Sequence, residues 1–218
     1  MFKKILIPLD GSDHSLKIVG WATGLARVLE AQIILLSVVD RDEIETLWTV
    51  ANGPGLRTRS EEDGSAGRAS VITPTNVIDN AVSLANKRLL SEAEKVKASG
   101  IDVSVHVEYG SPAEVIVAQA HMLGIDLIAM ATRRESALAR GILGSVTDRV
   151  LHSTSTPVLT LYPGELDSFG DGNGPPKCVV VPLDGSVLSE SAIAPAIEIA
   201  RKAGADIVFT ETVRLLFY

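Results

Sequence analysis

The 218-residue sequence has little cysteine, few aromatic residues and no long hydrophobic run. The single cysteine, Cys178, excludes a disulfide within the chain, and its place in an apolar segment predicts a buried, unreactive thiol. Only 4% of the residues are aromatic while 46% are hydrophobic, so we expect an aliphatic core. No apolar run approaches the ~20 residues that cross a bilayer, and the first residues resemble no signal peptide. These absences predict a cytoplasmic protein without a membrane partner.

Positive charge is also scarce. A net charge of −7 and an isoelectric point near 5.1 argue against a nucleic-acid partner, because such partners require a positive field. The sequence contains no P-loop, serine-esterase, zinc-protease or dinucleotide-binding motif. The four histidines lie scattered, without metal-ligand spacing, so no protein-ligated metal is predicted; they are His14, His106, His121 and His152. At most a slow ATPase remains among the enzyme classes considered.

An internal repeat is the most informative feature that is present. The run Pro8-Leu9-Asp10-Gly11-Ser12 returns letter for letter at Pro182-Leu183-Asp184-Gly185-Ser186, each time after a short apolar segment. The same offset of 174 positions pairs Ala22 with Ala196 and Ile33 with Ile207, among others. The register holds over a whole strand-helix-strand unit, so the sequence predicts one module followed by the opening of a second.

Aliphatic runs alternate with helical patterns along the chain. Runs of this kind, without polar alternation, are typical of parallel strands covered on both faces. Strands are predicted at 5–9, 33–39, 101–107, 126–130 and 157–161, and helices at about 13–30, 75–98, 112–123 and 145–152, the third opening with a capping box at Ser111-Pro112-Ala113-Glu114. Residues 41–73 show no period and are interpreted as a mobile insertion. This order predicts a doubly wound five-stranded parallel α/β fold followed by a partial βαβ repeat.

Open parallel sheets bind ligands beyond the carboxyl ends of their strands. Asp10, Val38 and Met130 lie at such ends, together with the loop from Ala131 to Ser145. Gly144-Ser145 before a helix offers free amides and a positive helix end, which suit a phosphate, and Arg133, Arg134 and Arg140 crowd the same loop. The alternative is structural: Ser145 as an ordinary N-cap, the arginines as a solvated face, and Asp10 as a turn residue.

Several motifs resemble those of the universal stress protein family. They are Pro8-Leu9-Asp10-Gly11-Ser12, Gly110-Ser111-Pro112-Ala113-Glu114, Asp126-Leu127-Ile128-Ala129-Met130, Gly144-Ser145-Val146 and Pro157-Val158-Leu159. The resemblance implies an adenine-nucleotide alpha hydrolase-like domain that binds ATP or AMP, with Mg²⁺ accompanying ATP, and that serves stress resistance or signalling. The family's nucleotide contacts would fall on Pro8, Leu9, Asp10, Val38, Met130, Ala131, Arg133, Arg134, Gly144, Ser145, Val146 and Thr147.

Two residues depart from the motif that the resemblance supplies. The loop of ATP-binding members reads G-x-x-G, nine residues, then G-[ST], and here Ala131 and Arg134 replace the first two glycines while Gly144-Ser145 is retained. The alternative function is therefore a dimerisation or scaffold module of the same fold that binds no nucleotide.

The domain organisation follows from the repeat and the resemblance. We predict a universal stress protein domain at 1–164, a Gly- and Pro-rich linker at 165–176, and a truncated second repeat at 177–218 that docks on the first domain or on a partner chain, or is partly disordered. A homodimer is predicted through the edge strand 157–161, the C-terminal repeat, or both.

Overall fold

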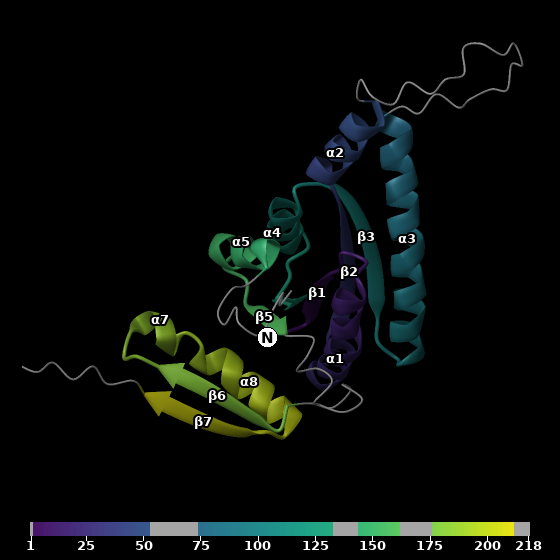
Figure 1. Cartoon of the computed structure of the whole chain (residues 1–218). Helices are drawn as coiled ribbons and strands as arrows, with labels where there is room; N and C mark the ends of the chain where they lie inside the picture. The colour runs from purple at the N-terminus through teal and green to yellow at the C-terminus, as the bar shows by residue number, and fades with distance from the viewer. Residues whose placement is uncertain (1, 53–73, 133–143, 162–175, 212–218) are drawn as a thin grey trace, which may run out of the picture.

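The computed structural model describes residues 2–52, 74–132, 144–161 and 176–211. Its larger part is a five-stranded parallel sheet of order β3-β2-β1-β4-β5, shown in Figure 1. The strands are β1 (Lys4–Pro8), β2 (Gln32–Asp40), β3 (Val103–Gly110), β4 (Leu127–Ala131) and β5 (Val158–Leu161). The helices of this part are α1 (Asp13–Leu29), α2 (Arg41–Asn52), α3 (Pro74–Ala98), α4 (Pro112–Met122) and α5 (Ser145–Ser153). The predicted five-stranded parallel α/β fold is confirmed.

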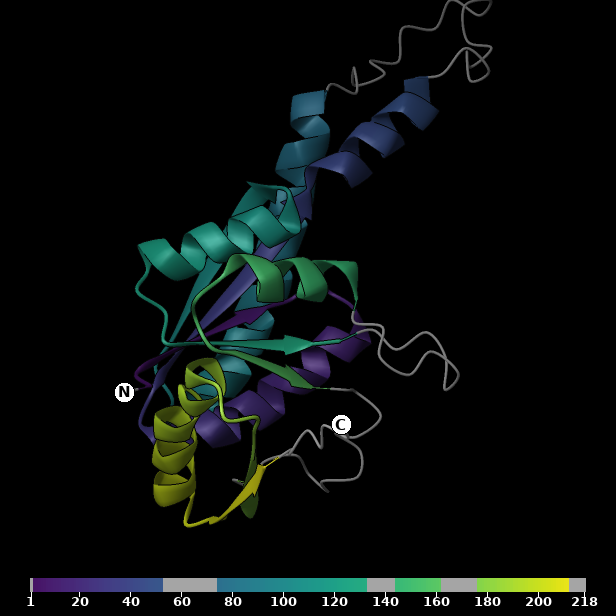
Figure 2. The ribbon, with the colours of Figure 1, turned by 90° about the vertical axis from the view of Figure 1, so that its left-hand side faces the viewer.

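Helices cover both faces of this sheet, as Figures 1 and 2 show. Ile5 and Ile7 pack on one face with Leu25 of α1 and Val96 of α3. Leu6 points to the other face and packs with Ile116 of α4 and Val150 of α5. Successive strand residues face opposite sides of a sheet, so a strand buried on both sides needs an unbroken aliphatic run.

The interpretation of residues 41–73 as a mobile insertion is wrong for its first part. Residues Arg41–Asn52 form α2, with Asp42 and Glu43 in the first turn, where carboxylates interact favourably with the helix dipole. Ile44 is buried. Ile44, Leu47 and Trp48 stand at helical spacing, a signal that the glycine-rich stretch after them obscured. The rest of the predicted insertion lies outside the described residues.

Two local predictions also need correction. The third strand runs from Val103 to Gly110 rather than from 101 to 107, because pairing with β2 continues as far as Asp40 opposite Gly110. Ser111 precedes α4 as expected and Pro112 opens the helix, but the Ser111 side chain makes no capping hydrogen bond. The capping box is therefore absent at this helix.

The C-terminal part reproduces the opening of the first. Strands β6 (Cys178–Leu183) and β7 (Asp206–Glu211) pair in parallel, with α7 (Val187–Glu190) and α8 (Ile193–Ala203) between them. Lys4 pairs with Gln32 in the first sheet and Cys178 with Asp206 in the second, so the pairing register follows the sequence offset of 174. The helix is broken in the copy, because Pro195 stands at the position of Trp21 and lacks the amide that a continuous helix needs.

This second unit lies against the first through α8 and α1 (Figures 1 and 2). Lys202 Nζ donates to the Leu29 carbonyl at 3.0 Å, and the Phe2 amide donates to Glu198 Oε1 at 3.3 Å. The second unit therefore docks on the first domain, which is one of the outcomes predicted for it from the sequence.

The predicted burial of Cys178 is wrong. Cys178 is exposed, because the described residues place no helix over that face of β6. No described helix is both long and apolar enough to cross a membrane.

Candidate functional site

A cleft of about 330 Å³ opens at the carboxyl ends of β1, β2 and β4. The strand order reverses between β1 and β4, and such a switch point is where open parallel sheets leave room for ligands. All the predicted site residues except Arg133 and Arg134 line this cleft; they are Pro8, Leu9, Asp10, Val38, Met130, Ala131, Gly144, Ser145, Val146 and Thr147. The sheet thus brings together residues that lie far apart in the sequence.

One half of the cleft is apolar. Met130 and Ile116 are buried and Val38 is half-buried, so together they provide a wall suited to a flat, weakly polar group. Ile116 and Pro112 come from α4 and were not predicted from the sequence. The i, i+4 spacing of these two residues at the start of α4 places both on the face towards the sheet, which is the signal that could have identified them.

The other half is formed by the first turn of α5. Gly144 is the N-cap residue, with φ −59° and ψ 146°, and no side chain among the described residues caps the helix. The amides of Ser145, Val146 and Thr147 belong to the group of donors that a helix leaves without partners inside itself. With the positive end of the helix dipole, they suit an anion.

Asp10 stands at the rim in a tight turn. Its Oδ1 accepts from the Ser12 amide at 2.9 Å and from the Ser12 hydroxyl at 2.6 Å. Gly11 between them has a φ of +77°, a conformation that favours glycine. The turn therefore holds an exposed carboxylate beside the cleft, as both sequence interpretations of Asp10 expected. Asp40 and Glu43 add two further carboxylates that the sequence analysis did not single out.

The two replaced motif glycines have different outcomes. Ala131 ends β4, pairs with Leu161 and packs its side chain against the core cluster on the α1 and α3 face. Ala131 does not have a positive φ, so no backbone strain arises there, and it lines the cleft of about 330 Å³. Arg134, like Arg133 and Arg140, lies outside the described residues.

Metal-binding side chains do not gather at this cleft. Within the described ranges no group of three or more His, Cys, Asp or Glu side chains could hold a metal ion.

The second unit repeats the Asp10 turn at Asp184, where the hydroxyl and amide of Ser186 lower the pKa of the carboxyl to about 2.

Comparison with known proteins agrees with this geometry. Residues 1–161 match the model of the universal stress protein family. Universal stress protein YxiE of Bacillus subtilis is 30% identical over 163 residues, covering 73% of this chain and 98% of that protein. Universal stress protein MJ0531 of Methanocaldococcus jannaschii is 29% identical over 161 residues, covering 74% of this chain and 82% of that protein.

The fold of the whole chain also has a counterpart among solved structures. The crystal structure of a universal stress protein from Archaeoglobus fulgidus superposes with a TM-score of 0.70 at 22% identity, and covers 97% of this chain and 67% of that one. At that identity the likeness shows the fold alone. The match of the family model over most of the chain identifies the protein as a member of the universal stress protein family.

Proposed function

We propose that this protein is a stress-response or signalling protein that binds an adenine nucleotide, ATP or AMP, in the cleft beside Asp10. The observation that carries the proposal is that an apolar wall lies next to the start of α5, which no described side chain caps, at the switch point of the sheet. A nucleotide has the matching two ends, a flat base and an anionic phosphate.

Each end of the nucleotide has a partner of suitable chemistry. The base would lie on Val38, Met130 and Ile116, and the Asp10 carboxylate would accept from an adenine amino group or a ribose hydroxyl. The phosphates would accept from the amides at the start of α5. Mg²⁺ would be carried by the phosphates of ATP, since the described residues present no cluster of metal ligands.

The amides of α5 allow a sharp test. Ser145→Pro removes the Ser145 amide hydrogen at the first helical position, where proline is tolerated, and the ψ of 146° at Gly144 suits a following proline. Ser145→Ala removes the hydroxyl alone and is the control. We expect Ser145→Pro to weaken AMP binding by about tenfold or more in calorimetry, because a charge-assisted hydrogen bond is lost, and to weaken it more than Ser145→Ala does.

Calorimetry and thermal shift with ATP and AMP, each with and without Mg²⁺, decide the proposal itself. Absence of heat and of stabilisation at millimolar nucleotide would refute it. The second candidate, a scaffold that binds no nucleotide, is favoured by the replaced motif glycines. Gain of AMP binding only after Ala131→Gly and Arg134→Gly together would support that candidate.

We further propose a homodimer through β5. Among the described strands, β5 is one of the two edge strands of the first sheet, the other being β3, and one side of its backbone faces away from β4. The carbonyls of Pro157 and Leu161 accept hydrogen bonds from the β4 side, so by alternation the Thr160 amide faces outwards. Thr160→Pro removes that donor and should yield monomers in light scattering, whereas Thr160→Val should not. A dimer that survives Thr160→Pro unchanged would contradict this seam.

The proposed organisation is tandem: a domain at 1–164, a linker at 165–176 and the opening of a second universal stress protein unit at 177–218. The copied pairing register supports it, and so does the Archaeoglobus fulgidus structure that covers almost the whole chain. We place the protein in the cytoplasm, as the sequence analysis expects.

A further inference from the structure

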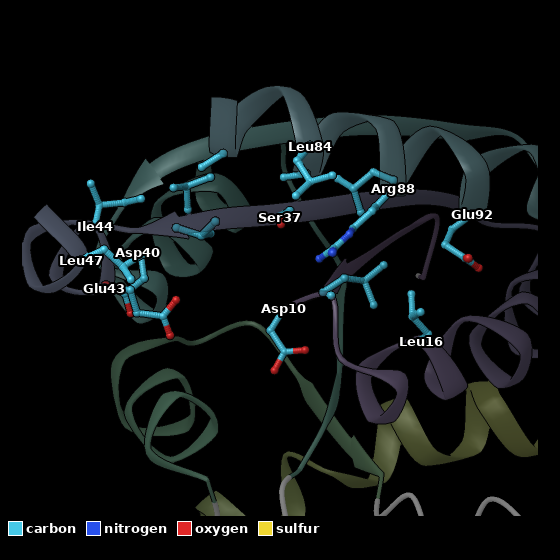
Figure 3. A pocket seen from close by; sticks show the side chains of 17 residues that line it. Asp10, Leu16, Ser37, Asp40, Glu43, Ile44, Leu47, Leu84, Arg88 and Glu92 are labelled. Carbon is cyan, nitrogen blue, oxygen red and sulfur yellow. The ribbon is translucent and has the colours of Figure 1, made fainter. Parts of the chain in front are cut away.

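A second cavity lies on the other side of the strand ends that border the nucleotide cleft. It has a volume of about 250 Å³ and is enclosed by the ends of β1 and β2 and by α1, α2 and α3. Figure 3 shows its lining from close by. We call it the α2–α3 pocket. Its volume is below the range usual for drug-sized ligands, so it suits a small molecule.

The walls of the α2–α3 pocket are mainly aliphatic. Leu89 of α3 and Ile44 of α2 are buried, and Leu16 of α1 is half-buried. Leu84 of α3 and Leu47 of α2 are 52% and 60% exposed. Exposed leucines at the mouth of a cavity lose water contact only when something fills it. An apolar group inside would therefore be favoured by the hydrophobic effect.

Arg88 is the one cation among the described residues that line this pocket. The Arg88 side chain lies next to Gly11, because a Cβ atom placed on that glycine would lie 3.0 Å from Arg88 Nη1 and 4.0 Å from Arg88 Cδ. In Figure 3 the guanidinium points into the pocket, between Asp10 and Glu92. No hydrogen bond or ion pair within the described part of the chain involves Arg88. A guanidinium is a strong bidentate donor to a carboxylate, and here it has that capacity unused.

Four carboxylates line the same pocket, namely Asp10, Asp40, Glu43 and Glu92. The Glu92 carboxylate contacts Lys95 Nζ at 2.7 Å, and Asp40 Oδ1 accepts from the Asp42 amide at 2.9 Å. A ligand with only a negative charge would meet repulsion from these groups, and a ligand with only a positive charge would meet Arg88. A ligand that carries a negative and a positive charge close together can interact favourably with Arg88 and with the carboxylates at the same time.

We propose that the α2–α3 pocket binds a free α-amino acid with an aliphatic side chain, of the size of leucine. The guanidinium of Arg88 binds the carboxylate, and the α-ammonium group faces Asp10 and Glu92. The hydrocarbon side chain packs on the leucines of α1 and α3. This site lies beside the nucleotide cleft and is distinct from it, although five residues line both cavities, namely Leu9, Asp10, Val38, Asp40 and Glu43.

The test is a titration of the nucleotide-free full chain with L-leucine, followed by calorimetry and by amide shifts in NMR spectra. Two analogues each lack one charge: 4-methylpentanoate has no ammonium group and isopentylamine has no carboxylate. L-Glutamate keeps both charges but places a third in the aliphatic part. We expect L-leucine to bind at least tenfold more tightly than all three, with shifts centred on Leu84 and Leu89.

Arg88→Gln should weaken L-leucine binding at least tenfold, because the bidentate partner of the carboxylate is lost. Lys87→Gln, at the exposed neighbouring position of α3, is the matched control and should leave binding unchanged. The proposal is overturned if L-leucine gives neither heat nor shifts at millimolar concentration, if 4-methylpentanoate binds equally well, or if Arg88→Gln binds like Lys87→Gln. Because no nucleotide is present, each result stands whether or not the cleft beside Asp10 binds AMP.

Discussion

The repeated turns supply a matched pair of capping mutations, Ser12→Ala and Ser186→Ala. Ser12 Oγ accepts from the Ser15 amide at 3.2 Å and Ser186 Oγ from the Ser189 amide at 3.1 Å. The local geometry is thus the same in both copies. The helices that follow differ: α1 has 17 residues, whereas α7 has four and no buried residue.

The expected magnitude follows from what each helix buries. Loss of a serine N-cap typically costs about 1 kcal/mol of stability. Ile18 and Ala22 of α1 are fully buried in the core, so the cost of Ser12→Ala should appear in the free energy of unfolding of the main domain. With a urea m-value of about 2 kcal/mol per molar, the midpoint should fall by about 0.5 M, and the melting temperature by about 2–4 °C.

Tryptophan fluorescence during urea unfolding is a suitable assay, because both tryptophans, Trp21 and Trp48, lie in the first part of the chain. Ser186→Ala should leave this transition unchanged, since its short helix stabilises only the second unit. An equal fall of the midpoint in both variants would refute the reasoning, because it would mean that the two units unfold as one. An unchanged midpoint for Ser12→Ala would show that the cap contributes nothing.

Three further predictions concern the first strand, the turn after it and the repeat. Leu6 is fully buried, whereas its counterpart in the repeat, Val180, is 58% exposed. In urea unfolding, Leu6→Ala should therefore lower the free energy of unfolding by about 2–5 kcal/mol, and Val180→Ala should lower it by less than about 0.5 kcal/mol. Equal losses of stability in the two variants would contradict the open face of β6. Gly11→Ala should cost about 1–2 kcal/mol by the same assay, because φ is +77°, and a stable variant would show that the turn relaxes. The Asp184 carboxyl should titrate near pH 2 in NMR spectra, because the hydroxyl and amide of Ser186 favour its charged form. A lowered pKa contributes stability above the ordinary value of 3.8 that is lost as pH falls towards 2; titration near 3.8 would exclude those hydrogen bonds.

Much of the candidate site could be predicted from the sequence because the rule for parallel sheets is general. Once strands are located, their carboxyl ends meet at one edge, so Asp10, Val38 and Met130 had to come near one another. The start of α5 followed from Gly144-Ser145 in the same way. The walls supplied by α4, and the acidic side chains of Asp40 and Glu43, did not follow, because the angle at which a helix packs is decided by side chains far away in the sequence.

Residue 178 and the α2–α3 pocket illustrate what a sequence pattern leaves open. An apolar strand predicts burial only if something covers it, and the described residues leave Cys178 exposed at the edge of a two-stranded sheet. The pocket joins Gly11 to Arg88, which are brought within contact by the packing of α3 beside α1. No motif marks such a pair.

The sequence by itself determined the order of the strands, the parallel fold and the two copied turns, because aliphatic runs and glycine turns act over a few neighbouring residues. Only the tertiary structure decided where cavities remain and which side chains share them. Cavities are what close packing leaves between elements, so they depend on the mutual positions of α2, α3 and the strand ends rather than on any one segment.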